Sequence, residues 1–144
     1  MPVPPRGDRG PEGWAAAQGG QLHDLLRAWA RGIDALEAAT ELLIRAGLAG
    51  PTHPWVRRAP GPAGGRGAAW IDFAAVSAYV GPMSPSERRV LLFAASLSDV
   101  DAAPAVRLGD LTRVGPRRLE LLVAAVGHAG GQRDAWRERA RAGG

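Results

Sequence analysis

Three arginines surround one glycine-proline pair and could contact a polyanion. Arg113 precedes Gly115-Pro116, and Arg117 and Arg118 follow it directly. Proline is favoured at the first position of a helix, so the two later arginines are expected on a first helical turn. In a helix-turn-helix protein that turn contacts phosphates or the edges of guanine bases. Arg113, Arg117 and Arg118 are therefore the expected nucleic-acid-binding residues of a protein that binds DNA.

The helix that follows these arginines also has a purely structural interpretation. It is rich in leucine, valine and alanine, and it carries few of the Asn, Gln, Ser or Thr side chains that read bases. Asp110 and Glu120 lie close to the arginines in the sequence. Two interpretations therefore stay open: a helical bundle with solvated arginines, or a small DNA-binding regulatory or accessory protein.

The sequence contains no recognisable constellation for catalysis or metal binding. Its three histidines, His23, His53 and His128, share no motif and have no neighbour at ligand spacing. The absence of cysteine excludes disulfides, thiolate catalysis and cysteine-based metal sites. No serine lies in a Gly-x-Ser-x-Gly elbow. We therefore expect a protein that is not an enzyme, with no catalytic residue, metal, cofactor or small-molecule substrate.

The overall charge is only a weak indication of a polyanionic partner. All 18 basic residues are arginine, whose very high pKa raises the isoelectric point although the formal charge is only +4. Eight arginines accompany six acids up to Trp70, and ten accompany eight acids after it, so neither half is a basic arm. No apolar run is long enough to span a bilayer, which favours a cytoplasmic protein without a membrane partner.

A heptad pattern predicts one long amphipathic helix over residues 21–46. Its apolar positions alternate in steps of four and three, with Thr40 in the remaining position. The positions are Leu22, Leu26, Trp29, Ile33, Leu36 and Leu43. We call this row of apolar positions the apolar seam. It is expected to pack either on the protein's own C-terminal domain or on a second copy or a partner protein. The second alternative gives the function that we expect first, a non-catalytic interaction module that self-associates as a homodimer or binds a protein partner. The small DNA-binding protein is the alternative.

Residues 70–131 are expected to form a small four-helix domain. A short helix should follow Asp72, and Ser84 opens a capping box with proline at the first helical position. A short helix from Leu108 and a longer one from Pro116 have the lengths of a helix-turn-helix. The predicted fold class is therefore all-α, a long amphipathic helix plus a helix-turn-helix-like C-terminal four-helix domain.

The remaining segments are expected to carry little structure. Proline and glycine in residues 1–20 predict a disordered N-terminus, and their abundance in residues 47–69 predicts a linker. Residues 132–144 form an arginine-rich tail with Trp136 as its one large apolar side chain, typical of a solvated, fraying helix.

One resemblance rests on the helical residues of the C-terminal half. The segments that carry it are Glu87–Leu91, Ala94–Leu97, Leu108–Leu111, Arg118–Val123 and Val126–Gly130. Together they are similar to the C-terminal half of uncharacterised small helical proteins of high-GC actinobacteria. The resemblance covers residues 70–131 and implies a helical fold. It implies no activity and no catalytic or binding residue.

Overall fold

The computed structural model describes residues 11–63 and 65–137. Within these ranges the chain is mostly helical, with one antiparallel sheet of two strands. In chain order the elements are α1 Pro11–Ala30, α2 Asp34–Arg45, β1 Val56–Ala59, β2 Ala68–Ile71, the 3-10 helix η1 Phe73–Ala78, α3 Pro85–Leu97, α4 Leu108–Leu111 and α5 Pro116–Ala129. The high helical content agrees with the all-α prediction, and the small two-stranded sheet is an addition to it. None of the described helices combines the length and apolar character needed to cross a membrane.

The long helix expected over residues 21–46 is in fact two helices. α1 starts earlier, at Pro11, and the helical chain breaks at Gly32. Gly32 has φ +99°, a left-handed conformation that glycine adopts at little cost. The Gly32 N–H donates to Glu37 Oε2 at 3.0 Å, and the acidic side chains of Asp34 and Glu37 favour the positive start of α2. Residues 11–20 therefore belong to a helix rather than to a disordered segment, whereas residues 1–10 lie outside the described ranges.

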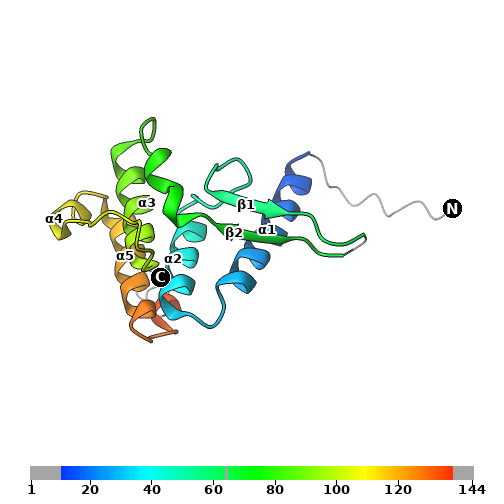
Figure 1. The fold of residues 1–144 in the computed structure, drawn as a ribbon. Helices are drawn as coiled ribbons and strands as arrows, with labels where there is room; N and C mark the ends of the chain where they lie inside the picture. Colours follow the sequence, from blue (N-terminus) through cyan, green and yellow to red (C-terminus); the bar gives the residue numbers. More distant parts are fainter. Residues whose placement is uncertain (1–10, 64, 138–144) are drawn as a thin grey trace.

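The apolar seam expected at a partner interface lies largely inside the protein. Leu22, Leu26 and Leu43 are fully buried, and Leu36 is partly buried against the same core. Because the chain turns at Gly32, α1 packs on β2 whereas α2 packs on α3 and α5 (Figure 1). Leu22, Leu26 and Leu43 are therefore inaccessible to a second chain, which corrects the predicted interface at these three positions. Trp29 and Ile33 remain exposed.

Much of the expected linker over residues 47–69 is an ordered hairpin. β1 pairs with β2 from Val56 opposite Ile71 to Ala59 opposite Ala68. Trp55 is buried before β1, where its Nε1–H donates to the Leu48 carbonyl oxygen at 2.7 Å. A Cβ atom at Gly61 would collide with the Arg66 carbonyl oxygen. Because glycine has no Cβ atom, the backbone at residue 66 can pass this close to residue 61. The linker prediction is wrong because glycine and proline here shape a turn between two strands.

The helix starts expected in the C-terminal half are confirmed. The Glu87 N–H donates to Ser84 Oγ at 3.3 Å, with Pro85 at the first position of α3. α4 starts at Leu108 and α5 at Pro116, whereas the helix expected after Asp72 is the 3-10 helix η1. Buried side chains of α1, α2, the hairpin, α3 and α5 form one continuous core. Residues 70–131 are therefore part of a shared core and not a domain separate from a preceding helix and linker.

The start of the expected solvated tail is also part of this core. Ala135 and Trp136 are buried, and the Arg45 guanidinium lies over the Trp136 ring at 4.8 Å. The Arg133 guanidinium donates to Asp34 at 3.1 Å. Trp136 thus anchors the chain that follows α5, which corrects the prediction of a fraying tail up to Arg137. Residues 138–144 lie outside the described ranges.

Candidate functional site

A cleft of about 570 Å³ opens where the end of α2 meets the start of α5. The turn before α5 supplies one wall, and the last residues of α2 with the following glycine supply the other. Its lining residues are Arg45, Ala46, Gly47, Val114, Gly115, Pro116, Arg117, Arg118 and Leu121. Three of these side chains are guanidinium groups and none is a carboxylate. The cleft can therefore attract an anion.

The start of α5 adds backbone donors to this cleft. Gly115 has φ +95°, and Pro116 takes the first helical position, which lacks an N–H group. No side chain caps this helix start. The first N–H groups of a helix have no partner within the helix, so those of Arg117 and Arg118 are unpaired within α5. The partial positive charge of the helix start and these N–H groups together favour a bound anion.

The arginines of the cleft differ in how firmly they are held. Arg45 donates from Nε to Glu41 at 2.9 Å and stacks on Trp136, so its guanidinium is fixed. Arg117 is exposed and Arg118 is half-buried. Among the residues that the structure describes, neither Arg117 nor Arg118 forms an ion pair. Two guanidinium groups are thus available to a ligand, beside a third that is already positioned.

The structure brings together part of the nucleic-acid-binding set predicted from sequence. Arg117 and Arg118 line the cleft, whereas Arg113 is exposed on the turn before it and does not line it. Arg45 was missed, because its place beside Arg118 depends on the packing of α2 against α5 and has no local sequence signal.

Beyond its first turn, the outer face of α5 offers one exposed polar side chain able to contact a base, Glu120, followed by two exposed valines. Val123 and Val126 are exposed there, while the opposite face packs mainly against α2. Hydrogen bonds to base edges require donors or acceptors at these positions. The start of α5 can therefore contact a phosphate, but the body of the helix does not resemble a base-reading helix.

A second group of titratable side chains lies where α2 meets the end of α5. Ligand-type atoms of Asp34, Glu37 and His128 all lie within 4.8 Å of one another. The Trp136 Nε1–H donates to His128 Nδ1 at 2.9 Å, and because indole is only a donor, Nδ1 carries no hydrogen. In the neutral ring Nε2 therefore carries it and donates to Glu37 Oε1 at 3.2 Å.

This arrangement does not suit a metal ion. A neutral histidine that binds a metal through Nε2 carries its hydrogen on Nδ1, which would face the hydrogen of Trp136. Both carboxylates already accept hydrogen bonds, Asp34 from Arg133 and Glu37 from the Gly32 N–H. That backbone bond is the main reason why the pKa of Glu37 is lowered. The group therefore serves as a structural connection between α2, α5 and Trp136.

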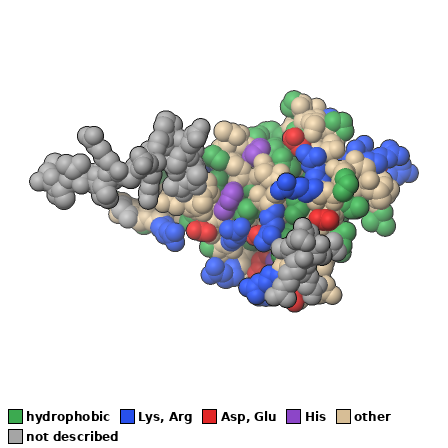
Figure 2. All heavy atoms as spheres, turned by 180° about the vertical axis from the view of Figure 1, so that it is seen from behind, with side chains coloured by type: hydrophobic (Ala, Val, Ile, Leu, Met, Phe, Trp, Pro, Cys, Tyr) green, Lys and Arg blue, Asp and Glu red, His purple; other side chains and the backbone are tan. Residues whose placement is uncertain are grey.

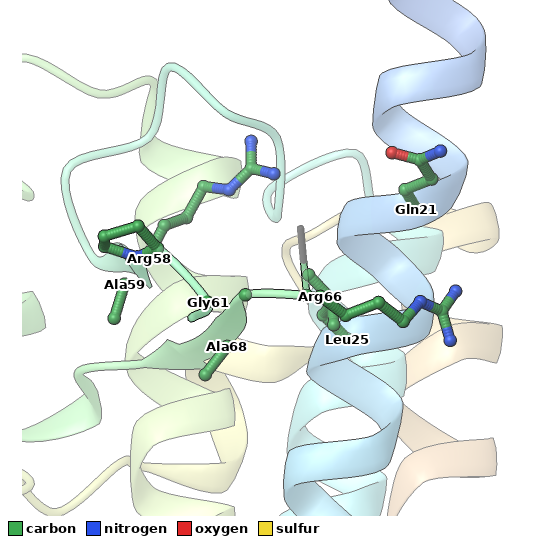
Figure 3. A pocket seen from close by; sticks show the side chains of 10 residues that line it. Gln21, Leu25, Arg58, Ala59, Gly61, Arg66 and Ala68 are labelled. Atoms are coloured by element: carbon green, nitrogen blue, oxygen red, sulfur yellow. The ribbon is translucent and has the colours of Figure 1, made fainter. Parts of the chain in front are cut away.

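A further cavity of about 490 Å³ lies between α1 and the hairpin. Figure 3 shows Gln21 and Arg58 on opposite sides of its opening, with Arg66 extended alongside α1. The rest of the lining is glycine, alanine, proline and Leu25. The two guanidinium groups lie apart, and no helix start faces this cavity. It therefore offers an anion fewer converging donors than the cleft at α5.

Comparison of the chain with models of known protein families, with curated proteins and with solved structures gives no match.

Proposed function

We propose that this protein binds double-stranded DNA through its phosphate backbone, without reading the base sequence. The observation that supports the proposal most is the cleft at the start of α5, which Arg45, Arg117 and Arg118 line and where no side chain caps the helix. Phosphate oxygens accept hydrogen bonds from guanidinium groups and helix starts, and these contacts supply most of non-specific DNA affinity.

The distribution of charge beyond the cleft favours a long polyanion over a single small phosphate. Residues 107–120 contain four arginines, one aspartate and one glutamate. Arg107 and Arg113 are exposed outside the cleft. Figure 2 also shows basic side chains at the end of the molecule that α4 occupies in Figure 1. Successive phosphates of a duplex could contact these arginines together, whereas a free phosphate would contact the cleft alone.

The absence of sequence reading follows from the exposed face of α5. Val123 and Val126 contribute no hydrogen bonds to base edges, so the affinity should depend on charge and salt and not on base sequence. Two duplexes of equal length and different sequence are thus expected to bind equally well.

The proposal is tested with fluorescence anisotropy on a labelled mixed-sequence duplex. The double variant Arg117→Glu with Arg118→Glu reverses the two unpaired charges of the cleft and should lose binding. Arg31→Glu with Arg66→Glu is the matched control, since it changes the net charge equally at exposed arginines outside the cleft. Equal loss in both double variants, or binding retained in the first, would contradict the proposed site. Competition by pyrophosphate as effective as by unlabelled duplex would assign the cleft to a small phosphate.

A second candidate function is the binding of another protein or a second copy of the chain. It is favoured by the exposure of two large apolar side chains near the turn between the first two helices, Trp29 at 38% and Ile33 at 59%. The Trp29 ring is held in place by stacking on Phe73 at 6.5 Å between ring centroids, and ordered exposed tryptophans are common centres of interfaces. Sedimentation equilibrium of the wild type and of Trp29→Asp tests it. A concentration-independent monomer mass in the wild type would exclude self-association.

A further inference from the structure

Strand β1 leaves three backbone groups on the outer edge of the sheet without a partner among the described residues. The Asp72 N–H donates to the Trp55 carbonyl oxygen at 2.8 Å, in register with the ladder that starts at Val56. Because hydrogen-bonded and outward-facing residues alternate along an antiparallel pair, the backbone groups of Val56 and Arg58 point away from β2. The Val56 N–H donates to the His53 carbonyl oxygen, whereas the Val56 carbonyl and the N–H and carbonyl of Arg58 stay open. An extended chain beside β1 could therefore form three hydrogen bonds.

No helix in the described part of the chain packs extensively on this edge. α1 packs on β2, and β2 is the one described element in extensive contact with β1. Open strand edges bind peptides by adding a strand, in which main-chain hydrogen bonds give affinity and side-chain contacts give specificity. The side chains next to the edge therefore indicate which peptide fits.

The side chains next to the edge are basic on both faces of the sheet. Arg57 and Arg58 are exposed neighbours, and successive side chains of a strand point to opposite faces. Arg58 forms no ion pair with a described residue, and the one such pair of Arg57 is to Asp72, at 3.7 Å with both side chains partly exposed. Residues 47–69 contain three arginines and no acid. An added strand is therefore matched in charge by one acidic side chain on each face, that is, by two consecutive acidic residues.

The cavity between α1 and the hairpin lies beside one of these two positions. Its charged and amide side chains are Arg58, Arg66 and Gln21, and none of its lining residues is an acid. Figure 3 shows Arg58 and Gln21 on opposite sides of the opening. A peptide residue opposite Arg58 has its side chain on the same face of the sheet as the Arg58 side chain. A carboxylate at that position would face this cavity, where it meets donors and no competing acid.

We propose that β1 binds an extended segment of a partner protein with two consecutive acidic residues, and that this segment becomes the third strand of the sheet. Two of the three open backbone groups are carbonyl oxygens, which need a donor. A peptide backbone supplies N–H donors, whereas a phosphodiester offers only acceptors. A second copy of the chain fits poorly, because its own β1 would bring arginines against arginines. The site is separate from the cleft at α5 and does not depend on DNA binding.

Fluorescence anisotropy of labelled peptides with the full chain tests this inference. The probe is Ser-Thr-Val-Glu-Glu-Val-Thr-Ser, and the neutral control replaces both glutamates by glutamine. The acidic peptide should bind saturably and about 2- to 30-fold more tightly than the neutral one, the range for two opposite-charge cross-strand pairs. A third peptide keeps both glutamates but carries N-methyl groups on their backbone nitrogens, so it should lose binding. No binding of the acidic peptide, equal binding of the neutral one, or undiminished binding of the N-methylated one would overturn the proposal.

Two double variants connect the binding to β1. Arg57→Gln with Arg58→Gln removes both charges at the edge and should reduce the affinity for the acidic peptide to that for the neutral one. Arg117→Gln with Arg118→Gln is the matched control, because it removes two charges at the cleft of α5 and should retain peptide binding. A loss confined to this control would place the peptide in the cleft and contradict the proposal. Duplex affinity that falls as much as peptide affinity in the β1 variant would assign these arginines to nucleic acid, which would equally contradict it.

Discussion

His128 and Trp136 are joined by a hydrogen bond of 2.9 Å from the indole Nε1–H to the imidazole Nδ1. This bond places the hydrogen of the neutral ring on Nε2, which donates to Glu37. One histidine on α5 therefore connects the segment after α5 to the first turn of α2. The Arg45 guanidinium stacks on the same Trp136 ring, and Arg45 also lines the cleft at the start of α5.

Trp136→Phe should destabilise the protein by about 1–3 kcal/mol, because the buried His128 Nδ1 loses its donor while an aromatic ring still fills the space. Urea denaturation measures the change. Arg133→Ala is the control: it removes an exposed ion pair to Asp34 and should cost about 1 kcal/mol or less. Equal effects of the two variants would show that the indole hydrogen bond does not connect these segments.

Acidification should weaken the fold partly through Glu41. Burial alone would raise the pKa of Glu41, but the hydrogen bonds from Arg27 and Arg45 outweigh it and lower the pKa below the ordinary value of 4.5. The unfolded chain therefore binds this proton more readily, so the stabilisation is complete above about pH 4.5 and is lost as the pH falls through the folded pKa. Urea denaturation at descending pH should show this loss, and Glu41→Gln should show a smaller dependence on pH. An unchanged pH profile in the variant would contradict the role of Glu41.

Gly115→Ala should destabilise the protein by about 1–2 kcal/mol, because an alanine adopts positive φ only with strain. Space is not the cause, since a Cβ atom at Gly115 meets nothing within 4 Å. Gly109→Ala is the matched control: Gly109 also has free space but ordinary φ within α4, so alanine there should be neutral or stabilising. Chemical denaturation of both variants decides whether the start of α5 needs this glycine.

Leu22→Ala and Ile33→Ala test the division of the apolar seam. Leu22 is fully buried, so its truncation should cost about 2–5 kcal/mol, whereas truncation of the exposed Ile33 should change stability by about 0.5 kcal/mol or less. Denaturation midpoints of the two variants give the comparison. Similar small effects would indicate that the seam does not pack within the chain.

Local signals allowed several helix starts to be predicted from sequence. The cap at Ser84 and the proline at position 116 act within one turn, and α3 and α5 start where these residues place them. The break at Gly32 also had a signal, a glycine followed by Asp34 and Glu37. The regular heptad spacing concealed it, because the same apolar residues suit one helix or two.

The remaining features depend on contacts between distant residues. Val56–Ala59 pairs with Ala68–Ile71 across a glycine-rich turn, and composition alone does not distinguish such a turn from a linker. Arg45 reaches the cleft beside Arg118 only because α2 packs on α5. The Trp136 ring is buried because it meets His128 and Arg45, and neither contact follows from the charged segment around it.

The most direct test of DNA binding is the salt dependence of the affinity. Fluorescence anisotropy measures it between about 50 and 200 mM salt, for the wild type and for the double variant Arg117→Glu with Arg118→Glu. Each phosphate contact should contribute about 0.9 to the slope of log K against log salt, so the wild type with three or more contacts should bind with a slope of about −2.7 or steeper. The double variant should lose both affinity and about 1.8 of that slope. No binding by the wild type at the lower salt concentration, or an unchanged slope in the variant, would contradict the assignment of the cleft at α5 to DNA.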